Sequence, residues 1–200
     1  LHKIATLLAL LAQLGGPAMA AAGLEFFDVF TASKDGYKSI RIPSVVVTKI
    51  GVVLAFAEGR GADADQAGNS IILKRSRDDG RTWRPIQLIA DDGANSLNNP
   101  TAVVEQESGR VFLMYQRIPA HMKEQDKIVE TGYEGTNVYR NFITWSDDEG
   151  ATWSKPADIT RTTKRPTHAT TIASGPGIGI QLTRGPHKGR LIIPFNEGPY

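Results

Sequence analysis

The chain has 200 residues, of which 40% are hydrophobic and 22% charged, and its formal net charge is +2. This length suffices for one domain, and the scattered Lys and Arg residues predict neither a nucleic-acid partner nor a basic membrane-binding patch. The chain contains no cysteine, which excludes disulfides, cysteine nucleophiles and cysteine-ligated zinc. Its four histidines lack the spacing of metal ligands, so we expect no metal site and no cofactor.

The first 20 residues have the pattern of an export signal. Lys3 precedes an apolar run, residues 4–14, that is too short to span a bilayer. Residues 18–20, Ala-Met-Ala, supply the small-x-small pattern of a cleavage site. The alternative is an apolar first helix of the fold. We predict a signal peptide over residues 1–20, a secreted or periplasmic mature chain, and no membrane span after cleavage.

After the signal, short apolar and β-branched runs alternate with Gly and Pro, which is typical of strands. We expect a first strand at residues 26–30. Three hairpins of the same design follow at residues 45–56, 102–115 and 178–195, with turns at Gly51, Gly109 and Gly189. No sustained helical period occurs after residue 20, so the predicted fold class is all-β.

An octapeptide that can form its own turn occurs twice. Residues 76–83 read SRDDGRTW and residues 146–153 read SDDEGATW. Ser76 and Asp78 can hydrogen-bond to turn amides, Gly80 permits a positive φ, and Trp83 can pack under the turn. A structural role explains this pattern better than a ligand-binding one. Internal repeats of several strands each predict a propeller or another array of blades.

Long loops follow the inner strands at residues 58–69, 90–98 and 117–136. A loop as long as the last is usually functional or disordered. If the blades are equivalent, all three loops leave the sheets on one face, which is then the expected binding face. The third repeat has no octapeptide before Tyr200. We therefore expect an N-terminal piece of a longer protein that is inactive and poorly folded by itself.

Charged residues at the strand ends are candidates for a site, because a rigid sheet can hold them towards a ligand. Arg41 precedes a proline and an apolar strand, which favours an active-site arginine over a structural ion pair. Asp65 follows Arg60 by five residues, which favours catalysis over a solubilising loop residue. Arg60 itself is balanced between lining a pocket and supporting it. For Asp63 we favour a solubilising role.

The two octapeptides resemble the Asp-box, or BNR, repeat of sialidases and related propellers. Other segments resemble landmarks of the bacterial exo-α-sialidases (neuraminidases) in the order of that family: residues 41–43, residues 58–60 with Asp65, residues 98–100 and residues 174–182. The resemblance covers about residues 35–200. It implies a six-bladed β-propeller, of which this chain supplies about the first two and a half blades in one domain over residues 21–200.

The resemblance also implies a function. Members of the family release terminal sialic acids from glycoconjugates with retention and without a metal, so the implied partners are sialylated glycoproteins, glycolipids and oligosaccharides. By resemblance, Arg41 is one of three arginines that bind the sialic acid carboxylate, and Asp65 is the acid/base. Arg60 and Asn99 line the pocket near O4 of the sugar.

The residue types suit this chemistry. Sialic acid carries its carboxylate on the anomeric carbon, and a guanidinium fork binds a carboxylate by two parallel hydrogen bonds. That charge would repel a carboxylate nucleophile, whereas a Tyr polarised by Glu suits it. The leaving group needs a proton, which Asp65 can give. The Tyr–Glu pair comes later in the family, so Glu197 and Tyr200 are not assigned to it.

Two other functions stay open. One is a non-catalytic Asp-box propeller that binds glycans or proteins. The other is a trans-sialidase or a hydrolase of a related nonulosonic acid. Arg41 together with Asp65 favours an enzyme over a binding module, because a binding module needs no acid at that place. Fold analogy alone does not establish activity.

Overall fold

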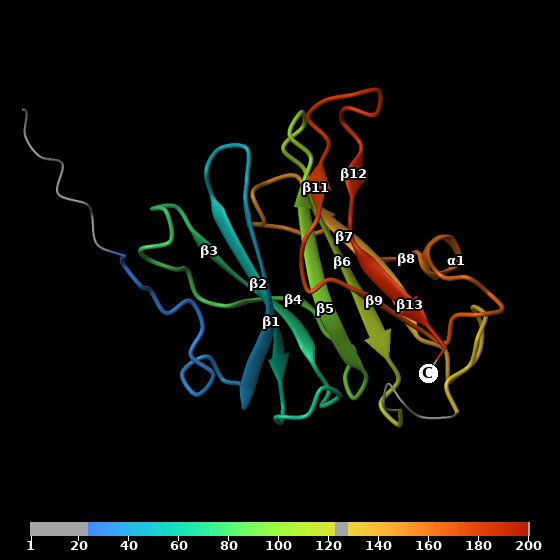
Figure 1. Ribbon diagram of the computed structural model, residues 1–200. Coiled ribbons are helices and arrows are strands. Elements are labelled where there is room, and N and C mark those ends of the chain that lie inside the picture. Colours follow the sequence, from blue (N-terminus) through green and yellow to red (C-terminus); the bar gives the residue numbers. More distant parts are fainter. Residues whose placement is uncertain (1–23, 123–127, 200) are drawn as a thin grey trace, which may run out of the picture.

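Two antiparallel meanders of four strands stand side by side (Figure 1). The computed structural model describes residues 24–122 and 128–199. The strands of the first meander are β1 (Ser39–Val47), β2 (Val53–Arg60), β3 (Ser70–Ser76) and β4 (Gln87–Ala90). Those of the second are β5 (Ser96–Val104), β6 (Val111–Ile118), β7 (Arg140–Ser146) and β8 (Ala157–Asp158). Each meander pairs its strands in sequence order, as a propeller blade does.

The C-terminal part forms an incomplete third unit. In it, β9 (Thr171–Ser174) pairs with β13 (Phe195–Gly198), and β11 (Ile180–Gln181) pairs with β12 (Leu191–Ile192). The short β10 (Gly177–Ile178) runs parallel to β5 and joins this unit to the second blade. A four-residue helix, α1 (Thr160–Thr163), precedes β9. Two complete blades and part of a third confirm the predicted all-β propeller class.

The predicted hairpins are present, although the third is shorter than expected. The first two are β1–β2 and β5–β6, which turn at Gly51 and Gly109. The third is reduced to the two-residue strands β11 and β12. Its predicted ends pair elsewhere, because Ile178 joins β5 and Phe195 joins β9. The apolar pattern thus located the strands but not all of their partners.

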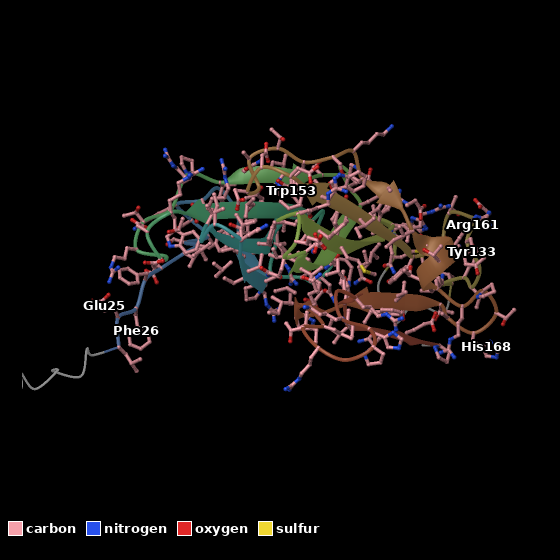
Figure 2. All side chains as sticks on the ribbon, turned by 90° about the horizontal axis from the view of Figure 1, so that it is seen from above. Glu25, Phe26, Tyr133, Trp153, Arg161 and His168 are labelled. Carbon is pink, nitrogen blue, oxygen red and sulfur yellow. The ribbon has the colours of Figure 1, made fainter. Side chains whose placement is uncertain are left out.

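The prediction of a strand at residues 26–30 is wrong. These residues form no strand, and Phe26 is 87% exposed on a segment that Figure 2 shows outside the sheets. Apolar residues form a strand only where their side chains find neighbours to pack against. Here a lysine holds the segment instead, since Lys74 Nζ contacts the Val29 carbonyl at 3.0 Å and the Asp35 carboxylate at 2.9 Å.

The predicted signal peptide, residues 1–20, lies outside the described residues. Within residues 24–122 and 128–199, no helix is long and apolar enough to cross a membrane. The position of the mature chain relative to a membrane therefore stays a prediction.

One apolar layer joins the two complete blades. It consists of buried side chains from both meanders: Val46, Val52, Leu54, Phe56, Ile71, Leu73, Leu97, Ala102, Val104, Val111, Leu113 and Tyr115. Full burial of a large apolar side chain stabilises a fold by about 1.5–3 kcal/mol. This layer therefore fixes the blades relative to one another and gives a rigid base for residues at the strand ends.

The octapeptides form the hydrogen-bonded turn that their sequence predicts. The Gly80 amide donates to Ser76 Oγ at 2.9 Å, and the Thr82 hydroxyl donates to Asp78 Oδ2 at 2.6 Å. Trp83 Nε1 donates to the Gly80 carbonyl at 2.9 Å. The second copy repeats all three contacts. Hydrogen bonds from the Thr82 hydroxyl and amide, and from Ser76, lower the pKa of Asp78 to about 2.

We expect the tryptophan of the second octapeptide to contribute more to stability than that of the first. Trp153 (Figure 2) packs against the shared core, and its ring meets Phe56 edge-on with centroids 5.6 Å apart. Trp83 is not part of that core. In the whole protein, Trp153→Ala should lower the free energy of unfolding by about 2 kcal/mol, because the ring is half-buried. Denaturant titration measures the loss. Trp83→Ala is the control, and an equal loss there would contradict the inter-blade role.

Candidate active site

A proline interrupts the first strand of each complete blade, and another follows β9 of the incomplete third unit. The pairing register shifts within residues 41–44 of β1 and within residues 98–101 of β5. The residue before the proline has a positive φ in every case, with 56° at Ile42, 56° at Asn99 and 64° at Gly175. The three segments that precede these prolines thus have equivalent positions in the three units, which their sequences alone did not indicate. Such bulges re-aim side chains and are frequent beside active sites.

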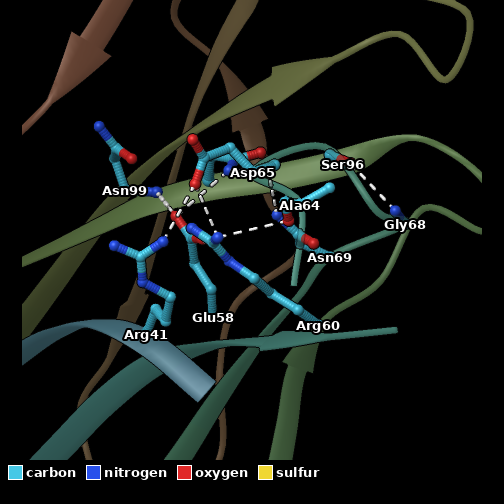
Figure 3. A network of polar contacts seen from close by, with 10 residues as sticks. Arg41, Glu58, Arg60, Ala64, Asp65, Gly68, Asn69, Ser96 and Asn99 are labelled. Carbon is cyan, nitrogen blue, oxygen red and sulfur yellow. Dashed lines mark hydrogen bonds and ion pairs between the residues drawn. The ribbon is translucent and has the colours of Figure 1, made fainter. Parts of the chain in front are cut away.

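A buried arginine lies at the centre of the polar cluster that surrounds the first bulge (Figure 3). The Arg60 side chain is only 1% exposed. Its Nε and Nη2 contact Glu58 Oε2 at 2.8 and 2.5 Å. Its Nη1 contacts the Ala64 carbonyl at 3.3 Å and Asp65 Oδ1 at 2.7 Å. Every guanidinium nitrogen therefore contacts a protein oxygen, and the side chain supports the loop that carries Asp65.

Glu58 forms the floor of this cluster and links the two blades. Its side chain is fully buried, and Oε1 accepts from the Asn99 amide at 2.7 Å and from Asn98 Nδ2 at 3.3 Å. Burial raises the pKa of Glu58, and the Asn99 amide and Arg60 oppose this only in part. Burial lowers the pKa of Arg60, but attraction to Glu58 and hydrogen bonds to Asp65 and Glu58 raise it on balance.

Two charged groups stand above this floor and face solvent. Arg41 and Asp65 have side chains that are 54% and 65% exposed. Arg41 Nη1 lies 3.5 Å from Asp65 Oδ1, the same oxygen that Arg60 holds from below. Figure 3 shows the Arg41 guanidinium and the Asp65 carboxylate side by side. An exposed guanidinium next to a fixed carboxylate can bind an anion and exchange a proton with a neighbouring group.

The structure brings all four predicted site residues together: Arg41, Arg60, Asp65 and Asn99. Asn99 is half-buried, and its main chain holds the bulge, because its amide binds Glu58 and its carbonyl accepts from Ser174 Oγ at 2.8 Å. The roles of these residues towards a sugar stay predictions. Glu58 had no predicted role, although a Glu two residues from an Arg on one strand faces the same side.

The long loops gather at the same end of the blades, as expected. The Gly68 amide donates to Ser96 Oγ at 3.1 Å, which ties the first loop to β5. The Ala120 amide donates to Asn95 Oδ1 at 3.0 Å, which ties the second loop to the third. The described part of the chain offers no group of three or more His, Cys, Asp and Glu side chains that could hold a metal.

Glu197 is occupied by a structural contact. Its side chain is 10% exposed and forms an ion pair with Arg165, whose amide also donates to Glu197 Oε1 at 2.5 Å. Burial raises the pKa of Glu197, but hydrogen bonds from the Arg165 amide and side chain lower it on balance. Glu197 is thus held in a structural ion pair, whereas Tyr200 lies outside the described residues, and the identity of the nucleophile pair stays a prediction.

Comparison with known proteins relates the chain to sialidases. The family described as "BNR repeat-like domain" matches residues 51–199. The chain is 33% identical over 175 residues to an exo-alpha-sialidase of Aspergillus fumigatus, covering 80% of this chain and 41% of the relative. It is also 33% identical over 178 residues to a sialidase of Micromonospora viridifaciens, covering 84% of this chain and 26% of the relative.

A solved structure shows the same similarity to sialidases. The Hadza microbial sialidase Hz136 superposes with a TM-score of 0.74 and 26% sequence identity, over 83% of this chain and 34% of that chain. The chain therefore spans less than half the length of the relatives that it matches.

Proposed function

The chain belongs to the BNR repeat-like family of sialidase propellers, and on this basis we propose that the whole protein is an exo-α-sialidase. It is a glycoside hydrolase that releases terminal sialic acids from sialylated glycoproteins, glycolipids or oligosaccharides. The observation that supports this most directly is the exposed pair of Arg41 and Asp65 over the buried Glu58–Arg60 pair. A glycan-binding propeller has no need of a carboxylate held in that position.

In the proposed mechanism, Arg41 binds the sialic acid carboxylate through two parallel hydrogen bonds. Asp65 protonates the glycosidic oxygen as the bond breaks and later takes a proton from water. Arg60 holds Asp65 Oδ1 at 2.7 Å and leaves its other oxygen free for this transfer. Asn99, beside Arg41 in Figure 3, lines the sugar pocket.

Two further elements of the proposal concern the remaining catalytic groups and the export of the protein. The reaction proceeds with retention through a Tyr nucleophile polarised by a Glu, and two further arginines complete the carboxylate site. The N-terminal signal directs the protein out of the cytoplasm, to the periplasm or the medium. The first element follows from the resemblance of residues 41–65 to the family, and the second from the apolar run and the Ala-Met-Ala pattern within residues 1–20.

Product analysis with the whole protein tests the proposal. Incubated with sialyllactose, it should release free sialic acid, with the α anomer appearing first in the proton NMR spectrum if the configuration is retained. Transfer of sialic acid to an added galactoside without free product would identify a trans-sialidase instead. Binding of sialyllactose without any release would identify a non-catalytic propeller and overturn the proposal.

We expect the bulge in β1 to serve the site at a cost in stability. A β-branched residue such as Ile42 is strained at a φ of 56°, and a backbone strain of this kind costs about 1–3 kcal/mol. Ile42→Gly removes the strain but adds freedom to the unfolded chain, worth about 0.5–1 kcal/mol. The melting temperature should therefore equal or exceed that of the wild type.

The same substitution should lower catalytic efficiency about tenfold, because the backbone next to Arg41 becomes less fixed. Thermal melting and sialoside kinetics on the same preparations measure the two effects. Ile50→Gly, in the exposed turn between β1 and β2, is the control for a glycine outside the site. A steep drop in melting temperature for Ile42→Gly with unchanged kinetics would show that Ile42 serves the fold alone.

A further inference from the structure

The loop that carries Asp65 is exposed, but buried side chains hold its main chain. The Asp65 carbonyl accepts from Asn69 Nδ2 at 2.6 Å and from Asn98 Nδ2 at 2.9 Å. Asn69 is fully buried and Asn98 is 3% exposed. Asn69 directly precedes β3, and Asn98 belongs to β5 of the next blade. One carbonyl oxygen is thus held from both blades at once.

The other polar atom of each amide has no such contact. Asn69 Oδ1 and Asn98 Oδ1 are buried and have no hydrogen-bond partner among the described residues. A buried acceptor without a partner destabilises the folded state. An apolar side chain of similar shape would avoid that cost, so stability alone does not explain an asparagine at these two positions.

The contacts together fix Asp65 at several points. Asn69 and Asn98 hold its carbonyl, while Arg60 holds its Oδ1 at 2.7 Å and the preceding carbonyl, of Ala64, at 3.3 Å. A residue held at both main chain and side chain has few ways to reorient. The buried groups that hold Asp65 thereby also set its distance of 3.5 Å from Arg41.

We infer that Asn69 and Asn98 are positioning residues that fix the acid/base Asp65 against the sugar-binding Arg41. This inference rests on the proposed function, which gives Asp65 its role. Small misplacement of a reacting group can cost about 10²-fold in rate. Loss of one of the two donors should cost less, because the other donor and Arg60 remain.

The test variant is Asn69→Leu in the whole protein, because Asn98 also lies 3.3 Å from Glu58 Oε1 and its loss would disturb the floor. The control is Asn141→Leu. Asn141 is likewise fully buried, its Oδ1 is likewise unpaired, and its Nδ2 donates to Thr163 Oγ1 rather than to the Asp65 loop. If Asn69→Leu does not fold, the smaller Asn69→Ser takes its place.

For Asn69→Leu we expect a melting temperature near that of the wild type and a loss of about tenfold in the hydrolysis of natural sialosides. Activated aryl sialosides, which need less proton transfer, should lose less. Amide hydrogen exchange over residues 61–68 should become faster, whereas Asn141→Leu should leave both the kinetics and this exchange unchanged.

Two results would overturn the inference. One is unchanged exchange over residues 61–68 in Asn69→Leu. The other is a fall in melting temperature with rates per folded molecule equal to those of the wild type. That result would show that Asn69 stabilises the fold but does not position Asp65 for catalysis. If the wild type itself releases no sialic acid, the proposed function fails, and the exchange measurement still decides whether the two asparagines fix the loop.

Discussion

Asp65→Asn should reduce the hydrolysis of natural sialosides by about 10²–10⁴-fold, the range for loss of a general acid. The substitution keeps the shape of the side chain, and its amide oxygen can still accept from Arg60 Nη1, which lies 2.7 Å from Oδ1. Folding should therefore be little affected. What is lost is the proton for a poor leaving group such as galactose. Aryl sialosides with good leaving groups should lose much less.

The same loop supplies a control for this comparison. Asp63 is exposed, as Asp65 is, but forms no ion pair within the described residues. Asp63→Asn should leave the rates on both classes of substrate unchanged. Steady-state kinetics of both variants on a sialyl oligosaccharide and an aryl sialoside test whether Asp65 is the general acid. Equal losses of Asp65→Asn on both substrates would show that Asp65 is not the acid.

Arg41→Lys should lower catalytic efficiency by about 10²-fold while the melting temperature changes little. The charge remains, so long-range attraction for an anionic sugar survives. The planar fork is replaced by a shorter, rotatable ammonium that cannot make two parallel hydrogen bonds to a carboxylate. The anomeric carbon is then held less firmly at the nucleophile. Because Arg41 is 54% exposed and 3.5 Å from its partner, its ion pair contributes little to stability.

Arg81→Lys is the control for this substitution, since the Arg81 side chain is 60% exposed and lies in the turn of the first octapeptide. It should alter neither the kinetics nor the melting temperature. If Arg41→Lys instead unfolds the protein and leaves carboxylate binding intact in the folded fraction, Arg41 is a structural residue and the assignment of the site is wrong.

The repeats and turns could be predicted because their signals are local. The octapeptides carry their own hydrogen-bond partners within four residues, and the structure reproduces them in both copies. Gly80 was expected at a positive φ and has one of 86°, but Asp79 before it also has a φ of 59°. The geometry of the turn requires this second left-handed residue. The sequence does not reveal it, because an Asp tolerates the left-handed region of backbone conformation without requiring it.

The floor of the site could not be predicted because its contacts join distant parts of the chain. Glu58 binds the Asn99 amide across 41 residues, and Asn98 binds the Asp65 carbonyl across 33. The sequence around a polar residue in an apolar strand does not indicate which distant residue it will hydrogen-bond to. Only the packing of blade on blade brings β2 and β5 close enough for these bonds. The expected third hairpin is too long for a related reason, since Ile178 pairs with β5, far away in sequence, and Phe195 pairs with the preceding strand β9.

In the proposed site, Arg41 binds the carboxylate of a terminal sialic acid, and a calorimetric cycle can test this role without any catalytic step. The whole protein and its Arg41→Lys variant are each titrated with an unsaturated sialic acid analogue and with the same analogue bearing a neutral carboxamide. The wild type should prefer the carboxylate by about tenfold or more, and the variant should lose most of that preference. If the two proteins discriminate equally between the ligands, Arg41 does not bind the carboxylate and the claim is contradicted.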